Sequence, residues 1–110
     1  PSTDRATAQW ERLTVASGGK QPATRCSHSA VAYSGTTMII FGGYNGSAQL
    51  SDVWRLTLDG SMAMWEELTV PSGRTQPTAR QGHSSVALAD GTMITFGGWF
   101  GSGYLNDVGR

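Results

Sequence analysis

The chain has 110 residues, and its eight basic residues balance eight acidic ones, so the formal net charge is zero. This length suits one domain, and without a basic stripe we expect no nucleic-acid binding. No apolar run approaches the ~20 residues of a membrane-spanning helix, so we expect no membrane contact. The single cysteine, Cys26, excludes an internal disulfide and favours a reducing, cytoplasmic compartment over secretion.

Short segments of β-type sequence alternate with loops rich in Gly, Ser, Thr and Pro along the whole chain. We expect strands at 10–15, 28–33, 38–43, 52–58, 64–70, 83–89, 93–98 and 105–110. The most informative segment is 38–43, where four apolar residues run into Gly42 and Gly43. Such a run predicts a strand buried on both faces, and the glycines suit a sharp turn or the close approach of another backbone.

The second half of the chain repeats the first at an offset of 55 residues, without insertion or deletion. Among the matched pairs are Trp10 with Trp65, Pro22 with Pro77, Arg25 with Arg80, His28 with His83, Phe41 with Phe96, and Asp52 with Asp107. Periods of ~20–50 residues mark solenoids, propellers or arrays, and this period lies near the upper end. The repeats are 1–55 and 56–110.

The repeated motifs resemble those of the kelch family. In order they are Pro-x-x-Arg-x-x-His-Ser, an apolar strand, Phe-Gly-Gly, Leu-x-Asp-Val-Trp and Trp-Glu-x-Leu. The resemblance implies an all-β, kelch-type β-propeller in which each repeat forms one four-stranded blade. Its strands a to d would be 28–33, 38–43, 52–58 and 64–70. The second copy would stop after strand c, and 10–15 would be strand d of the preceding blade.

Two blades alone leave two apolar faces open, because stacked blades each need two neighbours. Kelch propellers commonly have six or seven blades, so three copies of this chain would complete six. In that C3 homotrimer, a heterologous ring, strand 10–15 would pair with strand 105–110 of a neighbour. The alternative is that these blades are part of a longer chain.

A candidate protein-binding surface lies where the b–c and d–a loops open on the same side of a propeller. Aromatic side chains in such loops have no core to fill and suggest recognition, and a repeated arginine can clamp a carboxylate. The predicted surface consists of Arg25, Tyr44, Asn45, Gln49, Arg80, Trp99, Phe100 and Tyr104. The arginines have a structural alternative, in which they brace adjacent blades through carbonyls or an aspartate.

The other repeated residues have mainly structural interpretations. His28 and His83 begin strand a in equivalent blades, where we expect each to hydrogen-bond a neighbouring loop rather than a metal. We expect Asp52 and Asp107 to accept backbone N–H groups in the b–c loops. Trp10, Trp54 and Trp65 are expected to pack between blades. Gly109 stands at the position of Trp54 in the second copy and weakens that strand.

The leading functional hypothesis is a non-catalytic scaffold that binds another protein or peptide through these loops, without a cofactor. One alternative is a propeller-mouth enzyme of galactose-oxidase-like or lyase type. The copper chemistry of the former needs a tyrosine, cysteine and histidine constellation that we cannot assemble from this sequence. Another alternative is a designed or excised piece that assembles propellers and has no native partner.

Overall fold

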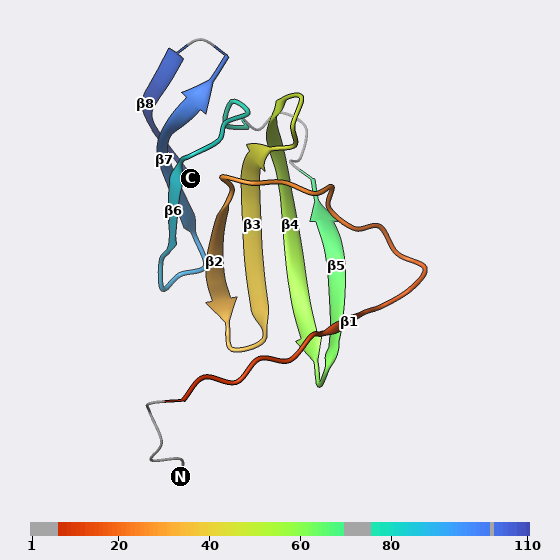
Figure 1. The fold of residues 1–110 in the computed structure, drawn as a ribbon. Coiled ribbons are helices and arrows are strands. Elements are labelled where there is room, and N and C mark those ends of the chain that lie inside the picture. The colour runs from red at the N-terminus through yellow and green to blue at the C-terminus, as the bar shows by residue number, and fades with distance from the viewer. Residues whose placement is uncertain (1–6, 70–75, 102) are drawn as a thin grey trace.

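The computed structural model describes residues 7–69, 76–101 and 103–110, and within them all regular structure is β (Figure 1). The strands are β1 (Thr14–Val15), β2 (Ser29–Ser34), β3 (Thr37–Tyr44), β4 (Gln49–Asp59), β5 (Met62–Leu68), β6 (Ser84–Ala87), β7 (Met93–Phe100) and β8 (Gly103–Gly109). The expected all-β class is confirmed.

The strands form two sheets that lie side by side (Figure 1). One sheet has the order β1-β5-β4-β3-β2, and the other has the order β6-β7-β8. Strands β2 to β5 form an antiparallel meander, which we call the first blade. Strands β6 to β8 repeat its first three strands, and we call them the second blade. The order predicted from the repeat, with the second copy ending after its third strand, is therefore observed.

The core lies in the first blade, around β3. Ile39, Ile40 and Phe41 are buried there, together with Val31 of β2 and Trp54 of β4. The apolar run is therefore buried on both faces, as its sequence predicts. In the second blade the equivalent of Phe41 is Phe96, which is 52% exposed where Phe41 is only 3% exposed. The difference arises because the second blade covers Phe41, whereas nothing in the described chain covers Phe96 in the same way.

The glycine pair after Phe41 creates a bulge into which another part of the backbone fits. Gly42 and Gly43 have φ angles of 71° and 108°, which favour glycine, and the register with β4 shifts between Phe41 and Gly43. A Cβ atom on Gly42 would lie 2.8 Å from the Arg80 carbonyl oxygen. The glycines are therefore needed for close backbone approach, as the sequence indicates.

The structure corrects the expectation for residues 10–15. Only Thr14 and Val15 form a strand, and they pair in parallel with β5 of the same chain. The Thr14 N–H donates to the Ser61 carbonyl at 3.0 Å. The outer edge of β5 is unpaired in a four-stranded blade and therefore attracts an extended segment.

The tryptophans also depart from their expected packing between blades. Trp10 is 95% exposed. Trp54 and Trp65 contact each other edge to face, with ring centroids 6.4 Å apart, but they belong to neighbouring strands of one blade. They therefore stabilise the first blade itself and not a contact between blades.

Candidate functional site

The loop end of the molecule is formed by the β3–β4 and β7–β8 turns and by the segments that lead into β2 and β6 (Figure 1). Each leading segment is joined to the turn of its own blade by a pair of backbone hydrogen bonds. Cys26 and Tyr44 exchange N–H to carbonyl bonds of 2.9 and 2.8 Å, and Gln81 and Trp99 repeat them at 3.1 and 2.8 Å. The sequence repeat thus builds the same local structure twice.

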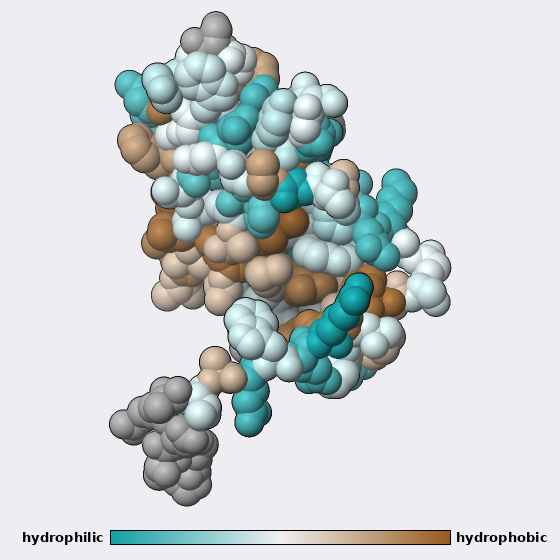
Figure 2. Space-filling model, in the orientation of Figure 1, coloured by the Kyte–Doolittle hydropathy of each residue, from teal (hydrophilic) through white to brown (hydrophobic). Residues whose placement is uncertain are grey.

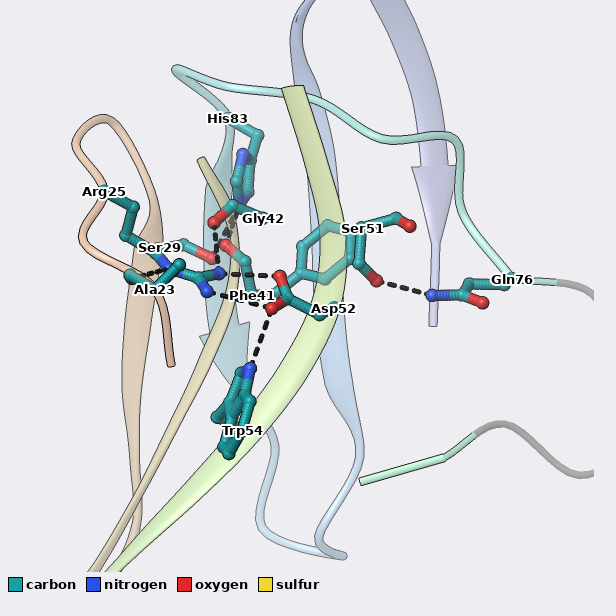
Figure 3. A network of polar contacts seen from close by, with 10 residues as sticks. All are labelled: Ala23, Arg25, Ser29, Phe41, Gly42, Ser51, Asp52, Trp54, Gln76 and His83. Atoms are coloured by element: carbon teal, nitrogen blue, oxygen red, sulfur yellow. Dashed lines mark hydrogen bonds and ion pairs between the residues drawn. The ribbon is translucent and has the colours of Figure 1, made fainter. Parts of the chain in front are cut away.

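The Arg25 side chain points into the first blade, where it holds the β3–β4 turn (Figure 3). Its guanidinium donates to both carboxylate oxygens of Asp52, at 2.6 and 2.9 Å, and to the Gly42 carbonyl at 3.1 Å. Asp52 also accepts a 2.7 Å bond from the Trp54 indole N–H. Charge-assisted bidentate pairs of this kind are strong and directional, so the Arg25 side chain, 4% exposed, is fixed in place.

Arg80 repeats this arrangement in the second blade. Its guanidinium donates to both oxygens of Asp107 at 2.8 Å and to the Gly97 carbonyl at 3.0 Å. The Arg80 side chain is 1% exposed, so it cannot itself reach a partner. We expected both aspartates to accept backbone N–H groups, but their main donors are the guanidinium groups. Both arginines are therefore structural, but their side chains brace their own blade through a carbonyl and an aspartate and not the adjacent blade, as the sequence alternative had it.

The ion pairs affect the acid titration of both aspartates. The hydrogen bond from Arg25 is the main cause that lowers the pKa of Asp52 below its usual value near 3.8. The bond from Arg80 likewise lowers the pKa of Asp107. Because each folded-state pKa lies below the unfolded one, the pairs contribute stability above about pH 4 and lose it as the pH falls further.

His83 joins the two blades. Its Nε2 lies 2.9 Å from the Phe41 carbonyl oxygen and 2.8 Å from Ser29 Oγ, both in the first blade (Figure 3). Ser29 Oγ in turn lies 2.7 Å from Ser85 Oγ. A carbonyl oxygen only accepts, so Nε2 carries the proton. His83 thus bonds strands β2 and β3 of the neighbouring blade, where we expected a loop, whereas His28 is exposed.

Aromatic side chains crowd the turn of the second blade. Trp99 and Tyr104 pack edge to face with centroids 4.9 Å apart, and Tyr104 and Phe100 are 88% and 45% exposed. Beneath them is an open hollow of about 390 Å³. We call it the second-blade hollow; its lining is Gln81, Gly82, Ser84, 96–99, Tyr104 and Leu105.

The turn of the first blade is more polar. The Asn45 side-chain oxygen accepts the N–H groups of Ser47 and Ala48, both at 2.9 Å, and so fixes the turn. The Tyr44 hydroxyl donates to the Gly46 carbonyl at 3.0 Å. Gln49 reaches across to the second blade, where its amide donates to the Gln81 side-chain oxygen at 2.8 Å.

Comparison with known proteins agrees with the repeat and with the blades. Residues 2–109 match the family described as the KLHDC2/KLHL20/DRC7 Kelch-repeats domain. The chain belongs to the kelch-repeat family.

Individual relatives are larger proteins. The chain is 36% identical over 100 residues to Adagio protein 3 of Arabidopsis thaliana, and equally to Adagio-like protein 1 of Oryza sativa subsp. japonica. It is 34% identical over 104 residues to leucine-zipper-like transcriptional regulator 1 of Homo sapiens. The match covers 90% of this chain but 15% of the length of the two plant proteins, and 94% and 12% for the human one.

The kelch loop end thus gathers all eight residues predicted for the protein-binding surface, but in two roles. Arg25 and Arg80 support the turns from within, and the other six are partly or fully exposed. Sequence reasoning missed Gln81, which stands where the first repeat has Cys26, so the repeat gave no signal for it. It also missed Ser29 and Ser85, since a serine within a strand indicates no particular contact.

No group of three or more His, Cys, Asp or Glu side chains within 7–69, 76–101 and 103–110 is arranged to hold a metal ion. In the same part of the chain, no helix is long and apolar enough to cross a membrane.

The Arg25 ion pair predicts a large difference between two conservative substitutions. Arg25→Lys should lower the free energy of unfolding by about 1–3 kcal/mol, because an ammonium lacks the planar fork that pairs with both Asp52 oxygens. Arg55→Lys is the matched control, since the Arg55–Glu66 pair is surface-exposed and should lose less than ~0.5 kcal/mol. Urea unfolding followed by tryptophan fluorescence measures both; equal losses would contradict the structural role of Arg25.

His83 predicts that stability falls in mild acid. Burial is the main cause that lowers its pKa below the usual 6.5, and its buried Nδ1 finds no partner within the described residues. A depressed folded-state pKa gives stability that is complete above about pH 6.5 and decreases as the pH falls below it.

We therefore expect His83→Gln, whose amide does not titrate, to flatten the loss of unfolding free energy between pH 7.5 and 5. Ser85→Ala is the control, because it removes the Ser29 contact without removing a titrating group. It should lower stability at every pH and leave the slope unchanged. A wild-type slope that persists in His83→Gln would show that another group is responsible.

Proposed function

We propose that this kelch chain is a non-catalytic protein-binding module whose ligand surface is the loop end. The observation that carries this proposal is the exposure of Phe100 and Tyr104 on a turn that the rest of the blade holds rigid. Aromatic residues are the usual anchors of protein interfaces. Fixing them before binding reduces the conformational entropy lost on association.

The rigidity of the surface has identifiable sources. Trp99 packs against Tyr104 on one side and bonds Gln81 through its backbone on the other. In the first blade, the Asn45 side chain closes its own turn. The Gln49–Gln81 bond then ties the two turns together, so that both blades contribute to one surface.

The chemistry of the surface favours a ligand with apolar and amide groups. The guanidinium groups of Arg25 and Arg80 are already paired with aspartates, so neither is free to clamp an acidic ligand. The residues of the predicted surface that face solvent carry aromatic rings or amides. Figure 2 agrees, since the loop end carries mostly pale and teal side chains, whereas apolar ones gather in a band lower on the sheets. We infer that an extended peptide with an apolar anchor is the ligand class.

Peptide selection tests the loop surface directly. Peptides from a random phage-displayed library that bind the wild-type chain should lose at least ~10-fold in affinity to Phe100→Asp, because the substitution puts a charge at an aromatic anchor. The matched control is Tyr33→Asp, since Tyr33 is also an exposed aromatic, at 52%, but lies at the far end of β2. The selected peptides should bind Tyr33→Asp with an affinity within ~2-fold of that for the wild-type chain.

Circular dichroism is the check that both variants are folded. Peptides that lose affinity equally to the two variants, or only to Tyr33→Asp, would refute a ligand surface at the loop end. They would instead favour a site on the sheet faces or at the opposite turns.

A further inference from the structure

The contact between the two blades has two complementary halves. The first blade supplies an accepting half: the carbonyl oxygens of Ser27, Phe41 and Leu50, with Ser29 Oγ and the Gly43 N–H. The second repeat supplies an inserting half, the segment 80–85. The Arg80 N–H donates to Leu50 at 3.0 Å, and the Gly43 N–H donates to Arg80 at 2.8 Å.

The same contact continues along the inserting segment. The Gly82 N–H donates to the Ser27 carbonyl at 2.8 Å, and His83 Nε2 reaches Phe41 O and Ser29 Oγ. The imidazole also packs edge to face on the Phe41 ring at 5.0 Å. Backbone atoms therefore make much of the contact, and they depend little on which side chains a repeat carries.

Each half occurs a second time in the chain, at the offset of 55 residues. The second copy of the accepting half is the second-blade hollow, with Phe96, Gly98 and Leu105 in place of Phe41, Gly43 and Leu50. The second copy of the inserting half is the segment 25–30, which carries His28 in place of His83. In the single chain these two are exposed: Phe96 is 52% exposed, and His28 faces solvent.

Segment 25–30 already has the conformation that docking requires. Ser27 has a φ of 58°, close to the 69° of Gly82 at the equivalent position. A left-handed φ is uncommon for serine, yet Ser27 adopts it although only its carbonyl contacts the second blade, through the Gly82 N–H. Arg25 bonds Asp52 and the Gly42 carbonyl in the segment's own blade. Arg80 bonds Asp107 and the Gly97 carbonyl in the same way. The segment therefore docks with little loss of entropy.

We propose that the second-blade hollow binds segment 25–30 of a second copy of this chain. The His28 Nε2–H of that copy donates to the Phe96 carbonyl and meets Ser84 Oγ, as His83 does with Phe41 and Ser29. Backbone hydrogen bonds to the Gly98 N–H and to the Leu105 and Gly82 carbonyls reproduce the remaining contacts between blades. One hydroxyl contact is lost, because Ala30 replaces Ser85.

The association is head to tail, because the two surfaces differ. Such a heterologous contact continues from chain to chain until a ring closes. Three chains would supply the six blades expected from the sequence. The hollow shares Trp99 and Tyr104 with the loop end but not Phe100, so substitutions of Phe100 distinguish this proposal from ligand binding at the loop end.

A single cysteine substitution tests the docking register. The Leu50–Arg80 bridge places Gln49 directly opposite Gln81, and residues so placed have Cα atoms roughly 4.5–5.5 Å apart, within disulfide range. In the docked pair the equivalent positions are Tyr104 of one copy and Cys26 of the other. Tyr104→Cys should therefore form a disulfide between chains with native Cys26 under oxidised glutathione.

Peptide mapping by mass spectrometry identifies the 26–104 link, and two variants control for random oxidation. Tyr104→Cys combined with Cys26→Ser should give no such link. Phe100→Cys, on the same turn but not opposite Cys26, should cross-link to Cys26 at least ~10-fold less. A 26–104 link within one chain, equal linking by Phe100→Cys, or no link overturns the proposal.

The native mass of the wild-type chain is the second readout, which needs no cysteine variant. Native mass spectrometry of the wild-type chain should give a mass that is a multiple of 11.7 kDa. His28→Ala should reduce this mass to that of one chain, and Phe100→Asp should leave it unchanged. A wild-type mass of one chain at every concentration overturns self-docking, while loop-end binding would remain testable by peptide affinity. If His28→Ala still has the mass of several chains, that result would also count against docking at this surface.

Discussion

The contact between segment 80–85 and the Phe41-Gly42-Gly43 turn holds the two sheets together, and most of the other features depend on it. It buries Phe41 and brings a backbone carbonyl so close to Gly42 that no side chain fits there. It also encloses His83, whose Nδ1 has no partner among the residues that the structure describes, and this burial disfavours protonation of the imidazole. Blades lack a shared hydrophobic centre, so such nearest-neighbour contacts determine their stability.

Ion pairs inside each blade prepare the surfaces for that contact. Arg25 and Arg80 hold the segment that leads into each blade against its own turn. The inserting and accepting surfaces are thus formed before blades meet. The same ion pairs support the turns that carry Phe100 and Tyr104. A single internal arrangement therefore supports both blade stacking and the proposed ligand surface, which explains why the arginines are buried although they lie beside exposed loops.

The sequence predicted the strands well because their signals are local. An apolar run ending in two glycines specifies a buried strand with a bulge, whatever surrounds it, and the structure shows both for 38–43. The repeat at an offset of 55 residues then predicted the corresponding strands in the second half of the chain. The contacts between distant residues were less predictable. Arg25 and Asp52 are 27 residues apart, and no pattern in the chain distinguishes an arginine that holds a loop from one that binds a ligand.

Residues 10–15 also show that a sequence pattern does not identify the partner of a contact. Their alternation predicts a strand, but a strand also needs a partner edge, and pattern alone does not identify which edge is free. In the single chain, only Thr14 and Val15 find one, on β5. Likewise, the exposure of Phe96 could not be inferred from its identity with Phe41, because burial depends on the neighbouring blade.

Amide hydrogen exchange measured by NMR tests the contact between blades most directly. The N–H groups of Gly43, Arg80 and Gly82 each donate across the junction. If that junction holds the sheets together, these three amides should exchange as slowly as the amides that join β3 to β4. If they exchange at the rate of exposed loops while β3 and β4 remain protected, the two sheets are not held together as described.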